Sequence, residues 1–419
     1  MYACPVSTGE ASGYAALTRA QLAVLVPELL LAGHLIDRAG LPHVLVALGP
    51  DGMRDVAIEE WRGASPVYTR RMQQALGFPG DDVVTIFKGL QLDIGAPPEF
   101  MDFRYSVEDE RHGSFQLAHC GALMDVEPMG EDYVRRMCHD IEDPTFDATA
   151  VATNAKAVMR PIHRPPRSPA DRHPHCAWTV TIDDANDAPP YPAEARVIGA
   201  TAAASFAGVS AIDPADEGRA DYAGPLFADV PFSEFSHSAL VRLAEEVALQ
   251  GHLLTLSYKL AAATRGLDTD DLLRKQFTGA AGVVAGRLRA ALELPASLGG
   301  AAQLLGVHPA LNPPGYVLAE VDTSDGLAIR FDRHSPAVAD GGWLGVLSAE
   351  HVEPLDAILH AIDPTLRAEV VVDSADELTV RVLPGAAADE RPEVAVTRFS
   401  TGAAFVLAER RTVLPVLNT

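Results

Sequence analysis

Three cysteines stand beside histidines at separate points in the first half of the chain. The pairs are His119-Cys120, Cys138-His139 and His175-Cys176. Thiolate and imidazole are ligands that zinc prefers, with Zn–S bonds of about 2.3 Å and Zn–N bonds of about 2.0–2.1 Å. Three protein ligands leave a fourth position for water, which is the catalytic pattern. The pairs therefore predict a centre for one metal ion, zinc rather than iron, with the predicted ligands Cys120, Cys138, Cys176 and one of His119 or His175.

The thiols also allow a centre without metal. An imidazolium beside Cys138 would lower the pKa of its thiol and make it a nucleophile. A closed Cys/His set that holds a structural zinc is another reading, and buried cysteines that only pack in a core are the simplest one.

Acidic residues follow Cys138 directly. Asp140 or Glu142 is predicted to move the proton of an attacking water, whereas Asp143 before Pro144 is typical of a turn. A solvated acidic turn would give the same pattern.

A basic, proline-rich stretch at residues 160–174 carries four arginines and two histidines. Arg160 and Arg164 are predicted to bind an anionic group of the substrate, and His163 is a further catalytic candidate. In the alternative interpretation, the arginines of this stretch pair with acids of the protein itself. Its prolines favour a loop.

The elements that must position these residues occur twice along the chain. Residues 20–183 recur as 238–401, at an offset of 216 to 221 residues; for example, Gly33-His34 matches Gly251-His252 and Arg71 matches Arg287. The three cysteines, by contrast, align with Pro336, Leu359 and Val394. His119 and His175 also change, to Ser335 and Glu393, whereas His139 aligns with His360, which favours a structural role for it. The comparison therefore predicts that the site belongs to the first copy alone.

Each copy is predicted to begin with helices and to continue with strands. In the first, Gly40 would end one helix, Ser65-Pro66 would begin another and Asp81-Asp82 a third. Strands are expected at 100–106, 114–120 and 177–182, with a helix at 131–141 before the last strand. In the second copy, helices are expected at 236–264, 268–294 and 298–305, and residues 376–392 read as an irregular loop. This order favours an α+β fold.

Composition narrows the function further. The chain of 419 residues has a formal charge of −24, which makes nucleic acid an unexpected partner. Its most apolar run, 22–35, is too short to span a bilayer, and no basic-then-apolar leader opens the chain, so we expect a cytoplasmic protein that binds no membrane. The sequence leaves the oligomeric state open, a homodimer included.

The cysteine pattern resembles the L-2-amino-thiazoline-4-carboxylic acid hydrolase family. The segments that carry the resemblance are AHCGAL around Cys120, MCHDIEDPTF around Cys138 and Asp140, and HCAWTV around Cys176. The resemblance covers residues 60–183. It implies a fold similar to the small-ligand domain named after vinyl reductase, and hydrolysis of a ring C–N bond in a cyclic amidine.

Together these patterns predict a tandem duplication of one helix-plus-antiparallel-sheet domain, packed as a pseudo-twofold pair. The first copy would span residues 1–184, a linker 185–235, and a degenerate second copy 236–419. The predicted function is a metal-dependent hydrolase that acts on a C–N bond of a small, polar, anionic molecule. The alternatives are a metal-free cysteine enzyme and a small-ligand sensor of the vinyl-reductase type.

Overall fold

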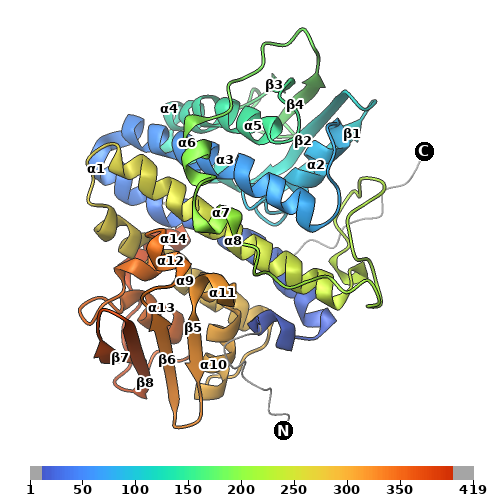
Figure 1. The fold of residues 1–419 in the computed structure, drawn as a ribbon. Helices are drawn as coiled ribbons and strands as arrows, with labels where there is room; N and C mark the ends of the chain where they lie inside the picture. The colour runs from blue at the N-terminus through green and yellow to red at the C-terminus, as the bar shows by residue number, and fades with distance from the viewer. Residues whose placement is uncertain (1–11, 400–419) are drawn as a thin grey trace.

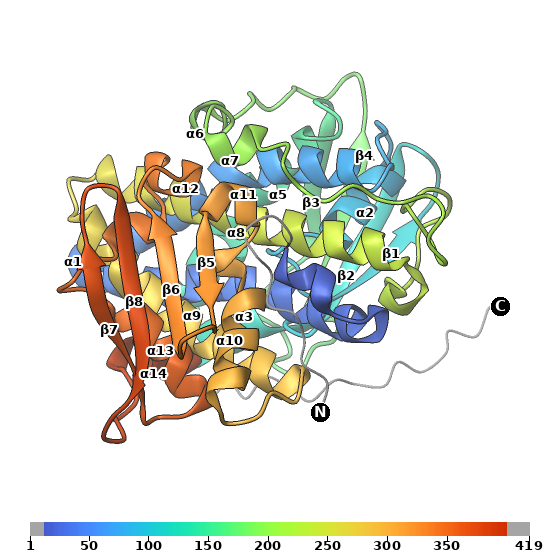
Figure 2. The same ribbon diagram turned by 60° about the horizontal axis from the view of Figure 1, so that its bottom comes forward.

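The computed structural model describes residues 12–399 of the chain. Figures 1 and 2 show two separate antiparallel sheets toward opposite ends of the molecule, with the long helices α1 and α8 between them. The fold is therefore α+β, as the sequence predicts, with two four-stranded sheets.

Helix α1, Arg19–Ala75, begins at a capping box. The Thr18 hydroxyl accepts from the Gln21 N–H, and the Gln21 side chain accepts from the Thr18 N–H. The helix is broken at Gly49, whose φ of 73° suits glycine, and Pro50 then opens the second segment. The predicted stop at Gly40 and the predicted start at Ser65-Pro66 were therefore wrong, since both sites lie inside helical segments.

The first sheet has the order β1-β2-β4-β3. Its strands are β1 Met101–Val107, β2 His112–Cys120, β3 Ala157–His163 and β4 Cys176–Ile182. In β4, Cys176, Trp178 and every second residue after them are buried, which confirms the predicted alternation. Strand β3 was missed, because Pro161 argues against a strand; the sheet accommodates it because β3 is an edge strand.

Six short helical elements belong to the same half as this sheet. They are α2 Val83–Gln91, α3 Gly121–Val126, the single turn η2 Glu127–Met129, α4 Glu131–Arg135, the π-helical turn η3 Arg136–Ile141 and α5 Glu142–Val151. The predicted start of a helix at Asp82 is confirmed, because its carboxylate accepts from the Thr85 N–H at the N-cap.

The second sheet repeats the strand order of the first, as β5-β6-β8-β7. Its strands are β5 Ala319–Asp322, β6 Leu327–Asp332, β7 Leu366–Asp373 and β8 Glu377–Pro384. The expected irregular loop at 376–392 thus contains a strand. The helices of this half are α8 His237–Ala263, α9 Thr269–Ala291, α10 Leu298–Val307, η5 Pro309–Leu311, α11 Pro314–Val317, α12 Pro336–Ala339, η6 Trp343–Val346, α13 Glu353–Ile362 and α14 Pro392–Phe399.

Strand pairing revises one correspondence between the two halves. Cys176 pairs with Leu117 where β4 meets β2, and Leu378 pairs with Phe331 where β8 meets β6. Val394 lies in helix α14 instead, so it does not occupy the place of Cys176.

Helices α5 and α13 revise a second correspondence. Asp147 in α5 accepts from the Met159 N–H, and Asp356 in α13 accepts from the Ala368 N–H, twelve residues on in each case. Cys138 precedes α5 whereas Leu359 lies within α13, so these two residues occupy different places.

Two ion pairs cross between the halves in a reciprocal way. Arg71 of α1 contacts Glu246 of α8 at 3.0 Å, and Arg287 of α9 contacts Glu28 of α1 at 2.6 Å. The Gln250 side chain of α8 also accepts from the Ile94 N–H. Helix α1 is long and apolar enough to cross a membrane by length and composition, but 67% of its most apolar window is buried inside the fold.

The segment between the halves is ordered. It contains α6 Ala193–Ile198, α7 Ala202–Ser205 and η4 Phe232–Glu234. Tyr222 is fully buried, and its N–H donates to the Leu76 carbonyl at the end of α1. The ammonium group of Lys88 donates to the Tyr222 carbonyl, so the segment is fastened to α2 as well.

Candidate functional site

A cavity of about 1230 Å³, including the part open to solvent, lies wholly within the first half. Its walls come from α1, β1 and the helices α3, α4 and α5 with the turns between them. Most of the lining is apolar and includes Leu41, Met53, Phe100, Phe103, Met129 and Met137. A mostly apolar cavity with a few polar groups is typical of a small-molecule site.

Glu142 lines the cavity and also interacts electrostatically with the three predicted thiol ligands. It lines the cavity at the first turn of α5, directly after the π-helical turn η3. Its Oε2 atom is buried and accepts no hydrogen bond from the described residues. Burial raises the pKa of this carboxyl to about 8, although the charge of Arg164 opposes the shift. At neutral pH Glu142 is therefore mostly a protonated acid.

All three cysteines lie within electrostatic range of Glu142. Cys120 is the N-cap of α3, Cys138 lies in η3 and Cys176 opens β4; all three are buried. Each thiol interacts electrostatically with Glu142, and Cys138 does so with both other thiols.

Burial also decides the protonation of the thiols. It raises the pKa of Cys120 to about 12 and raises the pKa of Cys138 and Cys176 well above their usual range, with the charge of Glu142 as the next cause. Because the thiolate is the reactive form, none of the three is activated as a nucleophile.

A second buried acid group lies at the wall formed by α1. Asp37 lines the cavity and is 9% exposed, and Glu60 behind it is fully buried. Burial raises the pKa of Asp37 to about 7, against hydrogen bonds with Glu60 and Trp61, and burial also raises the pKa of Glu60 well above its usual range. No N–H or O–H group within residues 12–399 donates to Glu60, so its hydrogen bond with Asp37 requires a proton on one carboxyl.

Other charged groups of the wall are engaged with one another. Arg38 lies 3.2 Å from Asp125, whose pKa is raised by burial to about 6. Asp93 accepts from the Tyr68 hydroxyl at 2.7 Å, and burial raises the pKa of Asp93 to about 6.

The ring centroids of His34 and Phe100 are 4.3 Å apart in a tilted contact. His34 is neutral at pH 7, because burial and the charge of Arg38 lower its pKa to about 3. The wall thus holds more acids than bases.

The predicted histidine ligands form a row apart from the cavity lining. The rings of His119 and His175 are 5.9 Å apart, and those of His173 and His175 are 5.0 Å apart. Burial, followed by the charge of Arg167, lowers the pKa of His175 to about 4. The imidazole of His175 is therefore neutral at pH 7.

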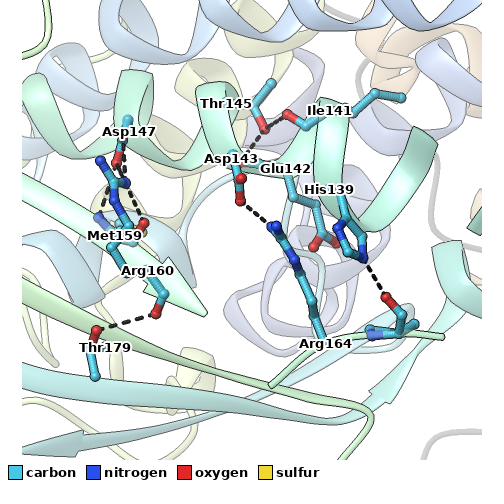
Figure 3. Close-up of polar contacts among 11 residues, drawn as sticks. His139, Ile141, Glu142, Asp143, Thr145, Asp147, Met159, Arg160, Arg164 and Thr179 are labelled. Atoms are coloured by element: carbon cyan, nitrogen blue, oxygen red, sulfur yellow. Dashed lines mark hydrogen bonds and ion pairs between the residues drawn. The ribbon is translucent and has the colours of Figure 1, made fainter. Parts of the chain in front are cut away.

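The arginines of the proline-rich stretch pair with acids of the protein itself. Figure 3 shows Arg160 on Asp147, at 2.9 Å, and Arg164 on Asp143. Neither arginine is among the residues that line the cavity. Arg160 belongs to strand β3 rather than to a loop.

Three further candidates also lie away from the cavity lining. His139 donates to the Pro165 carbonyl at 2.7 Å (Figure 3). Asp140 is half-exposed and lies 3.7 Å from Arg54. His163 ends β3, where burial and the charge of Arg172 lower its pKa. Among the predicted catalytic residues, the cavity lining includes Glu142.

The predicted metal ligands do not fit a metal ion in their observed positions. Among residues 12–399, no three His, Cys, Asp or Glu side chains are arranged to hold one. We therefore derive no chemical step through a metal.

Sequence reasoning missed His34, Asp37 and Glu60. A signal was present in the comparison of the two copies: at the same offsets as the glycines, Asp37 corresponds to Thr255 and Glu60 to Gln276. Both acids change to neutral residues in the second half, which also contains no cysteine. The cysteines were noticed because a thiol is a natural candidate for chemistry. An acid on a predicted helix is most simply interpreted as a solvent-exposed residue, so Asp37 and Glu60 were not singled out.

Comparisons with known proteins find no matching family model, no matching curated protein and no matching solved structure.

Proposed function

We propose that the first half of this protein is an acid–base enzyme that hydrolyses a small, largely apolar molecule held in the cavity. Water attacks the carbon and forms the new C–O bond, and Glu142 gives its proton to the leaving group as the bond from that carbon to the leaving group breaks. The proton lost by the attacking water returns to the Glu142 carboxylate, which restores the acid. The observation that carries the proposal is the Glu142 carboxyl: it lines an apolar cavity, has a raised pKa, and its Oε2 atom accepts no hydrogen bond from residues 12–399. A carboxylic acid that keeps its proton near neutral pH is suited to general acid catalysis.

The proposal includes an internal duplication, in which the second half is a degenerate, pseudo-twofold partner. Support comes from the shared strand order of the two sheets and from the reciprocal ion pairs of Arg71 and Arg287. In the second half, Trp343 stacks on Phe277, the counterpart of Trp61, at 4.7 Å. The indole of Trp343 also donates to Gln276, the counterpart of Glu60. In the second half, the Trp343 side chain thus packs against the counterparts of Trp61, which lines the cavity of the first half, and of Glu60.

The test begins with small aromatic esters, amides and cyclic amidines, whose hydrolysis is followed by mass spectrometry. For any compound that the protein converts, Glu142→Gln should lower kcat about 100-fold or more while binding persists. Leu45→Trp should block the cavity, whereas Val46→Trp, at a neighbouring position that is 88% exposed, should not. Glu131→Gln, on the exposed surface of α4, is the matched control for the lost carboxyl. Full turnover by Glu142→Gln would refute the proposed role.

Two alternatives make different predictions. A small-ligand sensor is favoured by the apolar cavity itself, and it predicts saturable binding in the cavity without turnover of any compound in the panel. A zinc-dependent hydrolase predicts about one zinc per chain on elemental analysis, released in Cys138→Ser. Measurements of turnover, ligand binding and zinc content on the purified protein distinguish the acid–base hydrolase, the sensor and the zinc-dependent hydrolase.

A further inference from the structure

The wall of the cavity formed by α1 carries buried polar atoms that no described residue satisfies. Asp37 Oδ1, His34 Nδ1 and Ser65 Oγ lie on residues that line the cavity, and none has a hydrogen-bond partner within residues 12–399. His34 and Asp37 are 7% and 9% exposed, and Ser65 is 2% exposed. Buried polar atoms are rarely left unpaired, so several on one cavity wall point to the polar group of a bound molecule.

The chemistry of this wall favours a donor of hydrogen bonds that carries positive charge. Asp37, whose pKa burial raises to about 7, is mostly a carboxylate at pH 7.5, so the wall carries a negative charge there. The nearest basic group on the wall, Arg38, is already paired with Asp125. An anion would meet repulsion here, and a neutral group would leave the charge uncompensated.

Aromatic rings stand beside the acid pair. Trp61, Tyr68 and Phe100 all line the cavity, and His34 lies 6.2 Å from the Trp61 ring. Faces of aromatic rings attract an ammonium group when it is withdrawn from water. Beyond them the lining becomes apolar, toward Met129 and Met137.

We propose that the cavity binds a small amphipathic amine, with its ammonium group at Asp37 and its apolar part toward Met129 and Met137. This inference rests on the proposed function only in using the same cavity, and it names the class of substrate. An ammonium group donates three hydrogen bonds, which matches the acceptors on the wall.

The proposal is tested with three probes that share one ring system: 1-naphthylmethylamine, 1-naphthylmethanol and 1-naphthoate. Binding to the full chain at pH 7.5 is measured by calorimetry. The amine should bind about tenfold or more tightly than the alcohol, because hydrogen bonds to charged groups are stronger than neutral ones, and the carboxylate should bind least.

Substitutions test whether Asp37 causes the preference for the amine over the alcohol. Asp37→Asn should reduce the difference between amine and alcohol to about twofold or less, which is a loss of the charged contact. The double variant Asp37→Thr with Glu60→Gln installs the residues that the second half has at these places, and should act in the same way if Asp37→Asn folds poorly. Asp132→Asn, an exposed acid on α4, should leave the preference unchanged and thereby excludes an effect of total surface charge.

The outcomes separate this inference from the proposed catalytic role. If the alcohol and carboxylate bind as well as the amine, and Leu45→Trp abolishes all binding, the cavity binds ligands but the amine proposal is wrong. If the amine preference holds while Glu142→Gln retains full turnover, the amine proposal stands and the catalytic one falls. If no probe binds at millimolar concentration, the amine proposal is refuted.

Discussion

Glu142 shows how surroundings set the chemistry of one side chain. Asp143 is its neighbour in sequence, yet it pairs with Arg164, and Glu142 faces an apolar cavity with three thiols around it. Removing a carboxylate from water raises its pKa, because the charged form loses its hydration. The difference between the two acids is therefore one of position rather than residue type.

The raised pKa of Glu142 has a measurable effect on stability. Its ordinary pKa is 4.5 and its pKa in the folded protein is about 8. Between these values the folded state keeps a proton that the unfolded chain releases. The free energy of unfolding should therefore fall as pH rises through this window, by up to about 1.4 kcal/mol per pH unit, with no further loss above pH 8.

Urea unfolding of Glu142→Gln at pH 5 to 9 checks this expectation. The amide has no proton to lose, so the variant should gain stability relative to the natural protein as pH rises toward 8. Glu131→Gln should run parallel to the natural protein. Parallel curves for all three proteins would mean that Glu142 titrates normally.

The thiols should be unreactive in the folded protein. A pKa raised from 9.0 to about 12 lowers the thiolate fraction of Cys120 about a thousandfold, and burial acts in the same direction on Cys138 and Cys176. In a Cys4→Ser background, Ellman's reagent should react with all three thiols only after unfolding in urea. Rapid labelling of Cys138 in the native protein would instead support the cysteine-nucleophile alternative.

At the scale of elements, α1, α8 and α9 are joined by ion pairs of unequal importance. Arg287 lies 2.6 Å from Glu28 and 2.9 Å from Glu99, so one guanidinium compensates two acids. Glu246, by contrast, is shared between Arg71 and Arg242, at 3.0 and 3.1 Å. Loss of one partner of a buried pair is costly because it leaves an uncompensated charge.

Arg287→Met should therefore destabilise the protein by about 3 kcal/mol. Arg71→Met should cost less, since Glu246 keeps the guanidinium of Arg242. Chemical denaturation of both variants gives the comparison. Equal losses, or a larger loss for Arg71→Met, would show that these contacts do not fasten the helices as described.

Across the whole molecule, the two halves depend on each other for their cores. Helix α1 packs along α8, and Gln250 of α8 donates to the Leu92 carbonyl while accepting from the Ile94 N–H. The buried backbone of the first half is thus completed by a side chain of the second. We expect both halves to unfold in one cooperative transition.

Two variants with a single tryptophan each test that expectation. Trp178 lies in β4 of the first half and Trp343 in η6 of the second. In each variant, the midpoint of the fluorescence change in urea should coincide with the midpoint from far-ultraviolet circular dichroism. Two separated transitions in either variant would indicate halves that unfold independently.

The sequence alone determined the local features of this protein. N-cap residues such as Asp82, the alternation in β4 and the recurrence of Gly33-His34 are visible in neighbouring or evenly spaced residues, and they led to the α+β class. Each of these features depends on contacts between residues close in sequence, or on a residue-by-residue comparison of the two copies.

Only the tertiary structure decided which side chains face the cavity and in what state of charge. Asp37 and Glu60 lie 23 positions apart, on the two segments of α1 that meet at Gly49, and nothing local tells two buried carboxyls from two solvated ones. Likewise Glu142, rather than Asp140, lines the cavity because η3 and α5 orient it there. Burial is a property of everything packed around a group, so the pKa of these acids is set by residues from the whole amino-terminal half.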